Sequence, residues 1–240
     1  VPIHEMGRAA DGEIYFSMKK VEGESLAERL AGIRETVEAT GMAHRGEVLL
    51  RGFLKVCEAM AFAHSKGVIH RDLKPPNIML GAHGEVLVMD WGLAKRIGEE
   101  SVEVDLRRLE VSGESDPLQT QEGNILGTPA YMPPEQARGE IARLDERSDV
   151  YALGAVLYSI LTLEFPYAGP ASRSVLLQVD EGKLIPPRER APEAQIPAEL
   201  EAAVLKAMAE DDGPATGIMY REVAALVRLA RGQGDAAVVL

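Results

Sequence analysis

The stretch that decides the fold is HRDLKPPN at residues 70–77, followed by DWG at residues 90–92. Between them, the apolar runs IML and VLVM flank the turn-rich segment GAHGE, which predicts a β-hairpin with Asn77 at its entry and Asp90 at its exit. Antiparallel pairing brings the two open ends of a hairpin together. An amide oxygen beside a carboxylate is a hard donor set suited to Mg²⁺. The base of this hairpin therefore predicts a metal site.

Asp72 lies five residues before Asn77, on the loop that leads into the same hairpin. Asp and Asn favour loops in general, so each of them alone is weak evidence for chemistry. The ordered set of polar residues from 70 to 90 is much more specific than any of its members. The hypothesis is a site in which the Asp72 carboxylate lies close to the predicted metal site.

Composition and charge exclude several classes of protein. The chain has 240 residues, of which 46% are hydrophobic and 27% charged, as in an ordinary globular domain. Its formal charge of −12 argues against a nucleic-acid partner or a membrane surface bound through basic charge. Cys57, the one cysteine, excludes an intrachain disulfide and suits a reducing compartment. The longest apolar stretch, 150–163, is shorter than the roughly 20 residues of a membrane span, so it predicts a buried helix.

Acidic residues are concentrated between Glu99 and Glu122. These 24 residues hold eight acidic and two basic side chains and carry half of the net charge. Ser, Gly and Pro interrupt any period there, which is typical of a mobile loop or a solvated insertion.

Hydrophobic periodicity outside this segment predicts a small strand remnant on a mainly helical body. Strands are expected where apolar runs are short and bounded by turn residues, and helices where apolar residues recur at three and four positions. The expected strands are 1–6, 14–21, 68–69, 78–80 and 86–89, and the expected helices are 26–33, 49–64, 150–162, 200–208 and 223–230.

The motifs at 70–77 and 90–92 resemble those of the protein kinase superfamily, specifically the bacterial eukaryotic-like (Hanks-type) Ser/Thr kinases. The resemblance implies that Asp72 accepts the proton of the substrate hydroxyl and that Lys74 steadies the transferred phosphate. It also implies that Asn77 and Asp90 hold Mg²⁺. DWG stands where the family usually has DFG, with tryptophan keeping a large aromatic ring. The same resemblance implies that His70 and Trp91 have structural roles.

Two later motifs carry the same resemblance. GTPAYMPPE at 127–135 is similar to the end of a kinase activation segment, with Glu135 in its usual Ala-Pro-Glu position and Thr128 typical of the Ser/Thr branch. SDVYALG at 148–154 is similar to the start of the central helix, where Asp149 would hydrogen-bond the catalytic-loop backbone. Taken alone, Asp149 is equally an acid that favours a helix N-terminus.

The beginning of the chain resembles the last strand of the kinase N-lobe and the hinge. The segment YFSMKKVEG, residues 15–23, puts Met18 at the gatekeeper position and lets the backbone of Lys19 and Val21 face the adenine of ATP. Met79 would form the floor under the ring. For Met18 and Met79, ordinary core packing is the alternative.

The chain departs from the family pattern in two places. It contains no Gly-rich loop and no strand lysine, so either the chain is a fragment of a longer protein, as we expect, or the protein lacks these parts. In both cases we expect the isolated chain to be inactive. Met219 stands where the family usually has the arginine that pairs with Glu135. Glu135 must therefore find another partner, of which Arg221 is one candidate, or be more solvated than usual.

A regulatory site is expected in the loop 92–127. Thr120 is the leading candidate for phosphorylation, because Arg71 helps to form a phosphate pocket in kinases of this type. Ser112 and Ser115 are weaker candidates. The alternative is a loop threonine without a regulatory role.

These observations predict an α+β, kinase-like, two-lobed fold. Residues 1–22 are the N-lobe remnant, 23–232 the C-lobe with its activation segment at 90–135, and 233–240 a tail or linker. The implied function is ATP- and Mg²⁺-dependent phosphorylation of protein Ser or Thr, and a catalytically silent interaction module is the alternative. Protein substrates and ATP are the expected partners, without nucleic acid or membrane contact from this segment. Dimerisation for autophosphorylation stays open. A cytoplasmic location is expected, alone or as part of a larger membrane-anchored protein.

Overall fold

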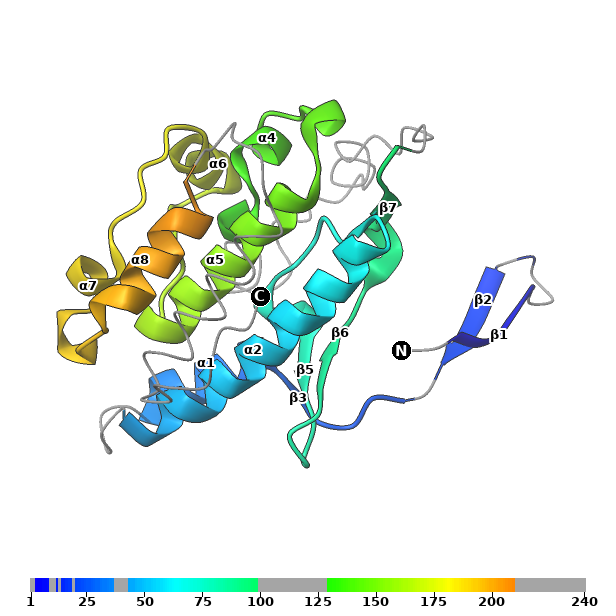
Figure 1. Ribbon diagram of the computed structural model, residues 1–240, viewed down its shortest axis with the longest axis horizontal. Helices are drawn as coiled ribbons and strands as arrows, with labels where there is room; N and C mark the ends of the chain where they lie inside the picture. Colours follow the sequence, from blue (N-terminus) through cyan, green and yellow to red (C-terminus); the bar gives the residue numbers. More distant parts are fainter. Residues whose placement is uncertain are drawn as a thin grey trace.

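The computed structural model describes residues 3–8, 12, 14–18, 20–36, 43–98 and 129–209. It has a helical body with three small antiparallel sheets (Figure 1), as the α+β prediction requires. The helices are α1 (Leu26–Thr36), α2 (Ala43–Ser65), α4 (Pro134–Ala137), α5 (Glu146–Thr162), α6 (Ser172–Asp180), α7 (Pro187–Arg190) and α8 (Ala198–Ala207). The strands are β1 (Ile3–Arg8), β2 (Ile14–Met18), β3 (Glu24–Ser25), β4 (Val68–Ile69), β5 (Ile78–Leu80), β6 (Val86–Val88) and β7 (Lys95–Arg96).

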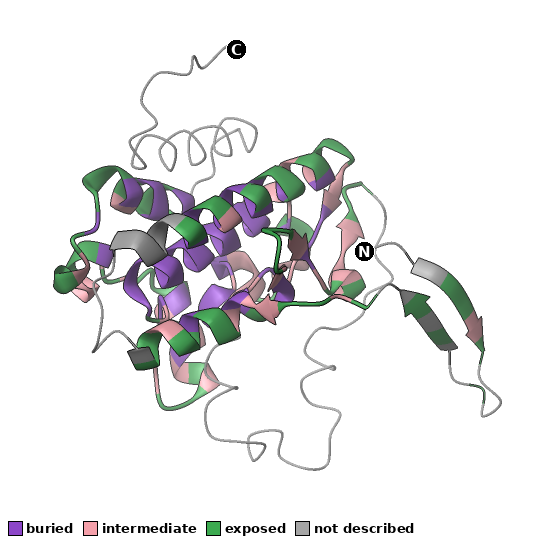
Figure 2. Cartoon of the chain, turned by 90° about the horizontal axis from the view of Figure 1, so that it is seen from below, coloured by how far each residue is buried: buried purple, intermediate pink, exposed green. Residues whose placement is uncertain are grey.

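Helix α5 is the centre of the body. Asp145 caps its N-terminus by accepting the backbone N–H of Arg147, and every residue from Ser148 to Thr162 is buried. Helices α2 and α8 pack against it, and Figure 2 shows the buried residues concentrated along these helices. A helix that is apolar nearly all round belongs in a core, which confirms the prediction for 150–162.

Gly154 lets α8 approach α5 closely. An ideal Cβ at this position would lie 2.8 Å from both Ala207 Cβ and Met208 Cγ. Glycine in a helix interior lowers stability relative to alanine, so its presence here is explained by the close packing of the two helices.

The sheets position the polar motifs. Strands β5 and β6 form the predicted hairpin, in which Ile78 pairs with Val88, and β3 extends this sheet by pairing with β5. The N–H of Met89 donates to the carbonyl of Asn77 at 2.8 Å, so the ladder continues one residue beyond the strands. Asp90 therefore follows directly after the last paired residue.

The other strands form two separate pairs. β1 pairs with β2, and this hairpin projects away from the helical body in Figure 1. β4 pairs with β7, which places residues 95–96 beside the start of the loop 70–77, called the catalytic loop below after the motif that it resembles.

Most of the elements expected from the sequence are present within the described residues. The strands β3 and β7 and the short helices α4, α6 and α7 were not predicted. The expected helix at 223–230 and the acidic segment 99–122 lie outside the described residues. No described helix combines the length and the hydropathy that a bilayer span needs.

Candidate active site

The loop between β4 and β5 brings three of the predicted residues together. Lys74 Nζ lies 2.9 Å from Asp72 Oδ2, and the Asn77 amide donates to the same oxygen at 3.1 Å and to the Asp72 carbonyl at 2.8 Å. The Asp72 carboxylate is therefore fixed by two donors that come from the following five residues. About a fifth of the Asp72 and Lys74 side chains is exposed, so the pair is accessible from outside.

Asp149 anchors this loop to helix α5. Its carboxylate is 1% exposed and accepts the backbone N–H groups of His70 at 2.7 Å and Arg71 at 2.9 Å. The Nε2 of His64, at the end of α2, lies 2.7 Å from Asp149 Oδ2. A buried carboxylate requires such donors, since its desolvation is otherwise very unfavourable. Asp149 therefore joins α2, α5 and the catalytic loop.

The ring of His70 connects the loop to the hairpin. The Asp72 N–H donates to Nδ1 at 3.2 Å, so Nδ1 is the acceptor and Nε2 carries the proton that goes to the Met89 carbonyl at 2.9 Å. The ring also packs against Trp91, with the ring centroids 4.6 Å apart. Trp91 in turn donates its indole N–H to the Val88 carbonyl at 3.0 Å. His70 and Trp91 thus hold the loop, the hairpin and the DWG motif in one arrangement.

Two site residues adopt left-handed backbone. Arg71 has φ 68° and Asp90 has φ 57°, and they are two of the four described non-glycine residues with positive φ. Such a conformation costs about 1–3 kcal/mol and persists only where the surroundings enforce it. At Asp90 the carboxylate accepts the N–H of Gly92 at 3.4 Å. The candidate site therefore contains two strained backbone positions.

The guanidinium of Arg71 is partly withdrawn from water. Its Nε donates to the Leu93 carbonyl, which ties the catalytic loop to the residues after Asp90. Burial lowers the pKa of Arg71, and the nearby charge of Asp149 opposes this shift. The predicted partner of Arg71, a phosphate on Thr120, lies outside the described residues.

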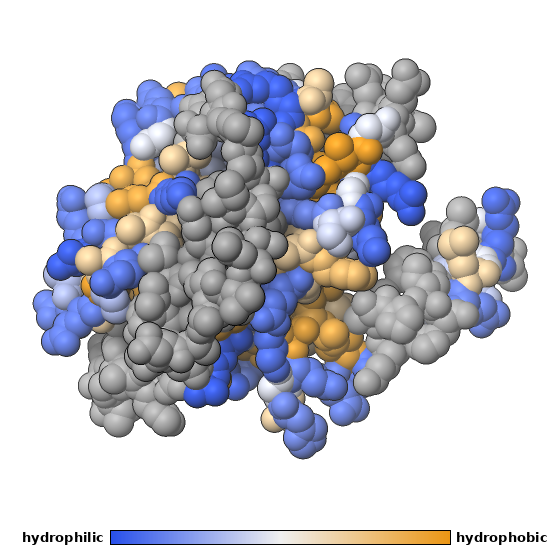
Figure 3. Space-filling view, viewed as in Figure 1, coloured by the Kyte–Doolittle hydropathy of each residue, from blue (hydrophilic) through white to orange (hydrophobic). Residues whose placement is uncertain are grey.

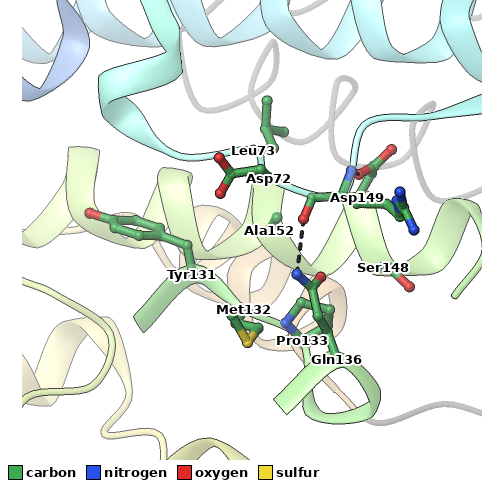
Figure 4. Close-up of a pocket in the computed structure, with 10 residues that line it drawn as sticks. Asp72, Leu73, Tyr131, Met132, Pro133, Gln136, Ser148, Asp149 and Ala152 are labelled. Carbon is green, nitrogen blue, oxygen red and sulfur yellow. Dashed lines mark hydrogen bonds between the residues drawn. The ribbon is translucent and has the colours of Figure 1, made fainter. Parts of the chain in front are cut away.

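A pocket lies between the catalytic loop and the segment 129–136 (Figure 4). Asp72 and Leu73 line it from the loop, and Met132, Pro133 and Gln136 line it from the opposite side. The amide of Gln136 donates to the Arg71 carbonyl at 3.1 Å across this pocket. Asp72 and the apolar residues Met132 and Pro133 thus line the same pocket.

Glu135 has a partner other than an arginine side chain. The hydroxyl of Ser148, which is 2% exposed, donates to Glu135 Oε1 at 2.6 Å. Glu135 itself is half-buried, so both a partner and partial solvation are present. Arg221, the candidate partner expected from the sequence, lies outside the described residues.

Tyr131 fastens the segment 129–136 to α5. Its hydroxyl lies 3.0 Å from Ser159 Oγ, and its ring meets Phe165 edge-on. Burial raises the pKa of Tyr131 to about 12, against the opposing effects of the Ser159 hydrogen bond and the Arg34 charge. The neutral phenol is therefore the stable form in the fold.

The residues expected to face a nucleotide are only partly described. Met18 ends β2, opposite Ile3, and Lys19 lies outside the described residues. Val21 and Met79 are half-buried, as is Leu87, which pairs with Met79, whereas Leu80 and Val86 pack against the core. Figure 3 shows apolar side chains at the surface in the region where Figure 1 places β5 and β6. This sheet therefore presents an accessible apolar surface beside the polar site.

The donor chemistry fits a divalent cation. The amide nitrogen of Asn77 is committed to Asp72, which leaves the carbonyl oxygen of that amide as the atom suited to a metal. Asp90 presents an exposed carboxylate just beyond the hairpin. Oxygen donors of these two kinds are those that Mg²⁺ prefers.

Thr128 also lies outside the described residues, so the structure does not test its predicted role.

Two residues of the site were missed by sequence reasoning: His64, which contacts Asp149, and Gln136, which contacts the Arg71 carbonyl. The i+4 spacing from Met60 marked His64 as one more position on an amphipathic helix, and Gln136 directly follows a recognised motif. Neither pattern predicts these long-range partners.

Comparison with known proteins points to the same family as the sequence motifs. A model of the protein kinase domain matches residues 4–211. The chain is 38% identical over 221 residues to a serine/threonine-protein kinase PknD of Chlamydia pneumoniae, covering 88% of this chain and 22% of that protein. It is 41% identical over 175 residues to a PknD of Protochlamydia amoebophila, covering 70% of this chain and 17% of that protein.

The chain thus spans about a fifth of the length of these curated relatives. Nevertheless, the family model covers most of the chain, and the motifs at 70–77, 90–92 and 127–135 fall within it. The chain belongs to the protein kinase family, and these curated relatives are bacterial serine/threonine-protein kinases.

Proposed function

We propose that the protein transfers the γ-phosphate of ATP to Ser or Thr hydroxyls of protein substrates. The observation that supports this most directly is the Asp72 carboxylate, held by Lys74 and Asn77 at the edge of the pocket in Figure 4. A general base has to be ordered and within reach of the hydroxyl that it deprotonates. Asp72 meets the first condition, and its place on the pocket supports the second.

The neighbouring residues have complementary roles in this proposal. Asp72 accepts the proton of the substrate hydroxyl, while the ammonium of Lys74, 2.9 Å away, contributes positive charge where negative charge develops. Asn77 and Asp90 would hold Mg²⁺, which supplies electrostatic stabilisation to the phosphate oxygens when bound. Met18, Lys19, Val21 and Met79 would receive the adenine. Thr128 would lie beside the substrate.

Regulation and organisation extend the proposal. Arg71 would bind a phosphate on Thr120, and residues 1–22 and 23–232 would belong to the N-lobe and the C-lobe. Protein substrates are the partners that this activity requires. The protein would act in the cytoplasm, alone or as the cytoplasmic part of a larger membrane protein.

The test measures transfer of labelled phosphate from Mg-ATP to casein by the full-length protein. Asp72→Asn should lower turnover by about 10²–10⁴ and keep nucleotide binding, because it removes only the base. Asp90→Asn should weaken Mg-ATP binding as well, because it removes a metal ligand. The control is Asp180→Asn, which makes the same chemical change on the exposed face of α6.

The proposal fails if the Asp72 and Asp90 variants retain the turnover of the unmodified protein. A full-length protein that binds no nucleotide and transfers no phosphate would instead support the catalytically silent interaction module.

A further inference from the structure

The peptide unit between Arg71 and Asp72 is held at both of its polar atoms. Its carbonyl accepts the Gln136 amide at 3.1 Å, and its N–H donates to His70 Nδ1 at 3.2 Å. A peptide unit is planar and rigid, so fixing the oxygen and the nitrogen fixes the plane. The Cα of Asp72 is part of this plane. The direction in which the Asp72 side chain leaves the loop therefore depends on both bonds.

The residue before this peptide is strained. Arg71 has φ 68°, and its own N–H is bound by Asp149 Oδ1 at 2.9 Å. A left-handed non-glycine residue relaxes when its restraints are removed, because the conformation is intrinsically unfavourable. Asp149 restrains the peptide before Arg71 and Gln136 restrains the peptide after it. Without the Gln136 bond, the second peptide is restrained only at its N–H, by His70.

Gln136 belongs to a different part of the site from Asp149. It lies on α4, three residues after Pro133, and its N–H donates to the Pro133 carbonyl at 3.1 Å. Met132 and Pro133 form the pocket wall opposite Asp72, and Figure 4 shows the Gln136 bond spanning the two sides. The wall and the catalytic loop are therefore linked by this amide.

We infer that Gln136 is a positioning residue, which couples the placement of segment 129–137 to the orientation of Asp72. This inference rests on the proposed phosphotransfer. The contact requires a donor, because it is made to a carbonyl oxygen. Methionine at position 136 keeps the length of the side chain without a donor, and glutamate presents only acceptors when ionised.

The experiment compares Gln136→Met and Gln136→Glu with a matched control in the full-length protein. The control is Gln178→Met on α6, since Gln178 makes the same kind of bond to the backbone carbonyls of Ala168 and Ser174, at 2.9 and 3.2 Å. Both Gln136 variants should lower kcat for casein phosphorylation by about three- to tenfold, the range expected for one lost hydrogen bond. KM for ATP should stay unchanged, and Gln178→Met should keep the original kcat.

A second readout does not require activity. Hydrogen exchange of the Arg71 and Asp72 amides should become faster in Gln136→Met and remain unchanged in Gln178→Met. Unchanged exchange and kcat in the Gln136 variants would overturn the inference, and so would equal losses of kcat and nucleotide binding, which indicate a general structural role. Faster exchange in a protein that transfers no phosphate would support the coupling while refuting the proposed function, so the two failures are distinguishable.

Discussion

The two halves of helix α5 are both largely buried but are stabilised in different ways. In the N-terminal half, Ser148 and Asp149 are 2% and 1% exposed, and their polar groups bind Glu135 and the catalytic loop. The C-terminal half is mostly apolar: residues 155–158 are completely buried, with the Tyr158 hydroxyl donating to the Ile185 carbonyl, and Gly154 between the halves allows contact with α8. One half therefore holds the active-site backbone, and the other anchors that half in the core.

This difference shows how a strained loop is kept in place. Hydrophobic packing has no direction, whereas hydrogen bonds to a buried carboxylate specify the positions of individual N–H groups. Leu73 anchors the loop between β4 and β5 in the core, whereas Asp149 fixes the positions of the His70 and Arg71 N–H groups. Substitutions in the polar half should affect turnover and stability together, and those in the apolar half should affect mainly stability.

The largest effect is expected for Asp149→Asn. The amide group replaces an oxygen that accepts N–H groups, so about 1.5–3 kcal/mol should be lost for each bond broken, roughly 4 kcal/mol in all. Urea unfolding and turnover should both show the loss. Asp145→Asn makes the same change on the same helix, and because asparagine is an equally good N-cap it should have little effect. Equal stability of the two variants would contradict the importance of the buried bonds.

The next effect concerns pH. The pKa of Tyr131 is raised by burial from 10.0 to about 12, so the fold binds the phenolic proton more tightly than the unfolded chain does. This stabilisation is complete below pH 10 and is lost as the pH rises through about 12, with a maximum of about 3 kcal/mol. Tyr131→Phe should lack this loss in urea unfolding measured at pH 9 and pH 12.

Tyr158 and Tyr167 also have a raised pKa because of burial. They are present in both proteins, so the difference between the two isolates Tyr131. Identical alkaline profiles would mean that Tyr131 is not protected in the fold.

Two glycines test the apolar half of the helix. Alanine at Gly154 would place its Cβ 2.8 Å from Ala207 and Met208, and overpacking of this kind costs about 1–3 kcal/mol. The control, Gly52→Ala on α2, places its Cβ 3.5 Å from Leu80 and should stabilise the helix by about 0.5–1 kcal/mol. Thermal unfolding would show opposite shifts. A lower Tm for both variants would indicate that the loss at Gly154 does not come from its close contact with α8.

The smallest effect is expected at the surface. Arg138 Nε lies 2.6 Å from Asp180 Oδ1, joining the residue after α4 to the end of α6. Both side chains are partly exposed, so Asp180→Asn should change the free energy of unfolding by less than about 1 kcal/mol, and less still at high salt. A loss as large as that of Asp149→Asn would remove the contrast between buried and exposed carboxylates.

Much of the fold follows from the sequence, because long apolar periods are local signals. The helices α1, α2, α5 and α8 were expected near their observed places, and the hairpin of β5 and β6 was expected at its observed place. β3 and β7 were missed, since each has two polar residues whose pairing depends on distant parts of the chain. Such strands carry no hydrophobic pattern.

The sequence predicts the candidate site as a set of residues but not its geometry. The HRD, Asn and DWG motifs point to the side chains that are proposed to carry chemistry. The left-handed backbone of Arg71 and Asp90 could not be inferred, because glycine is the residue that usually marks this conformation. The bond from Gln136 to Arg71 joins residues 65 positions apart, and no local pattern reports such a contact.

The two left-handed residues make glycine an informative replacement at this site. Glycine at position 71 or 90 would relieve the backbone strain, but it would also remove the bond from Arg71 to the Leu93 carbonyl or the carboxylate that accepts the N–H of Gly92. At both positions the loop therefore combines a backbone that suits glycine with side-chain contacts that glycine cannot make.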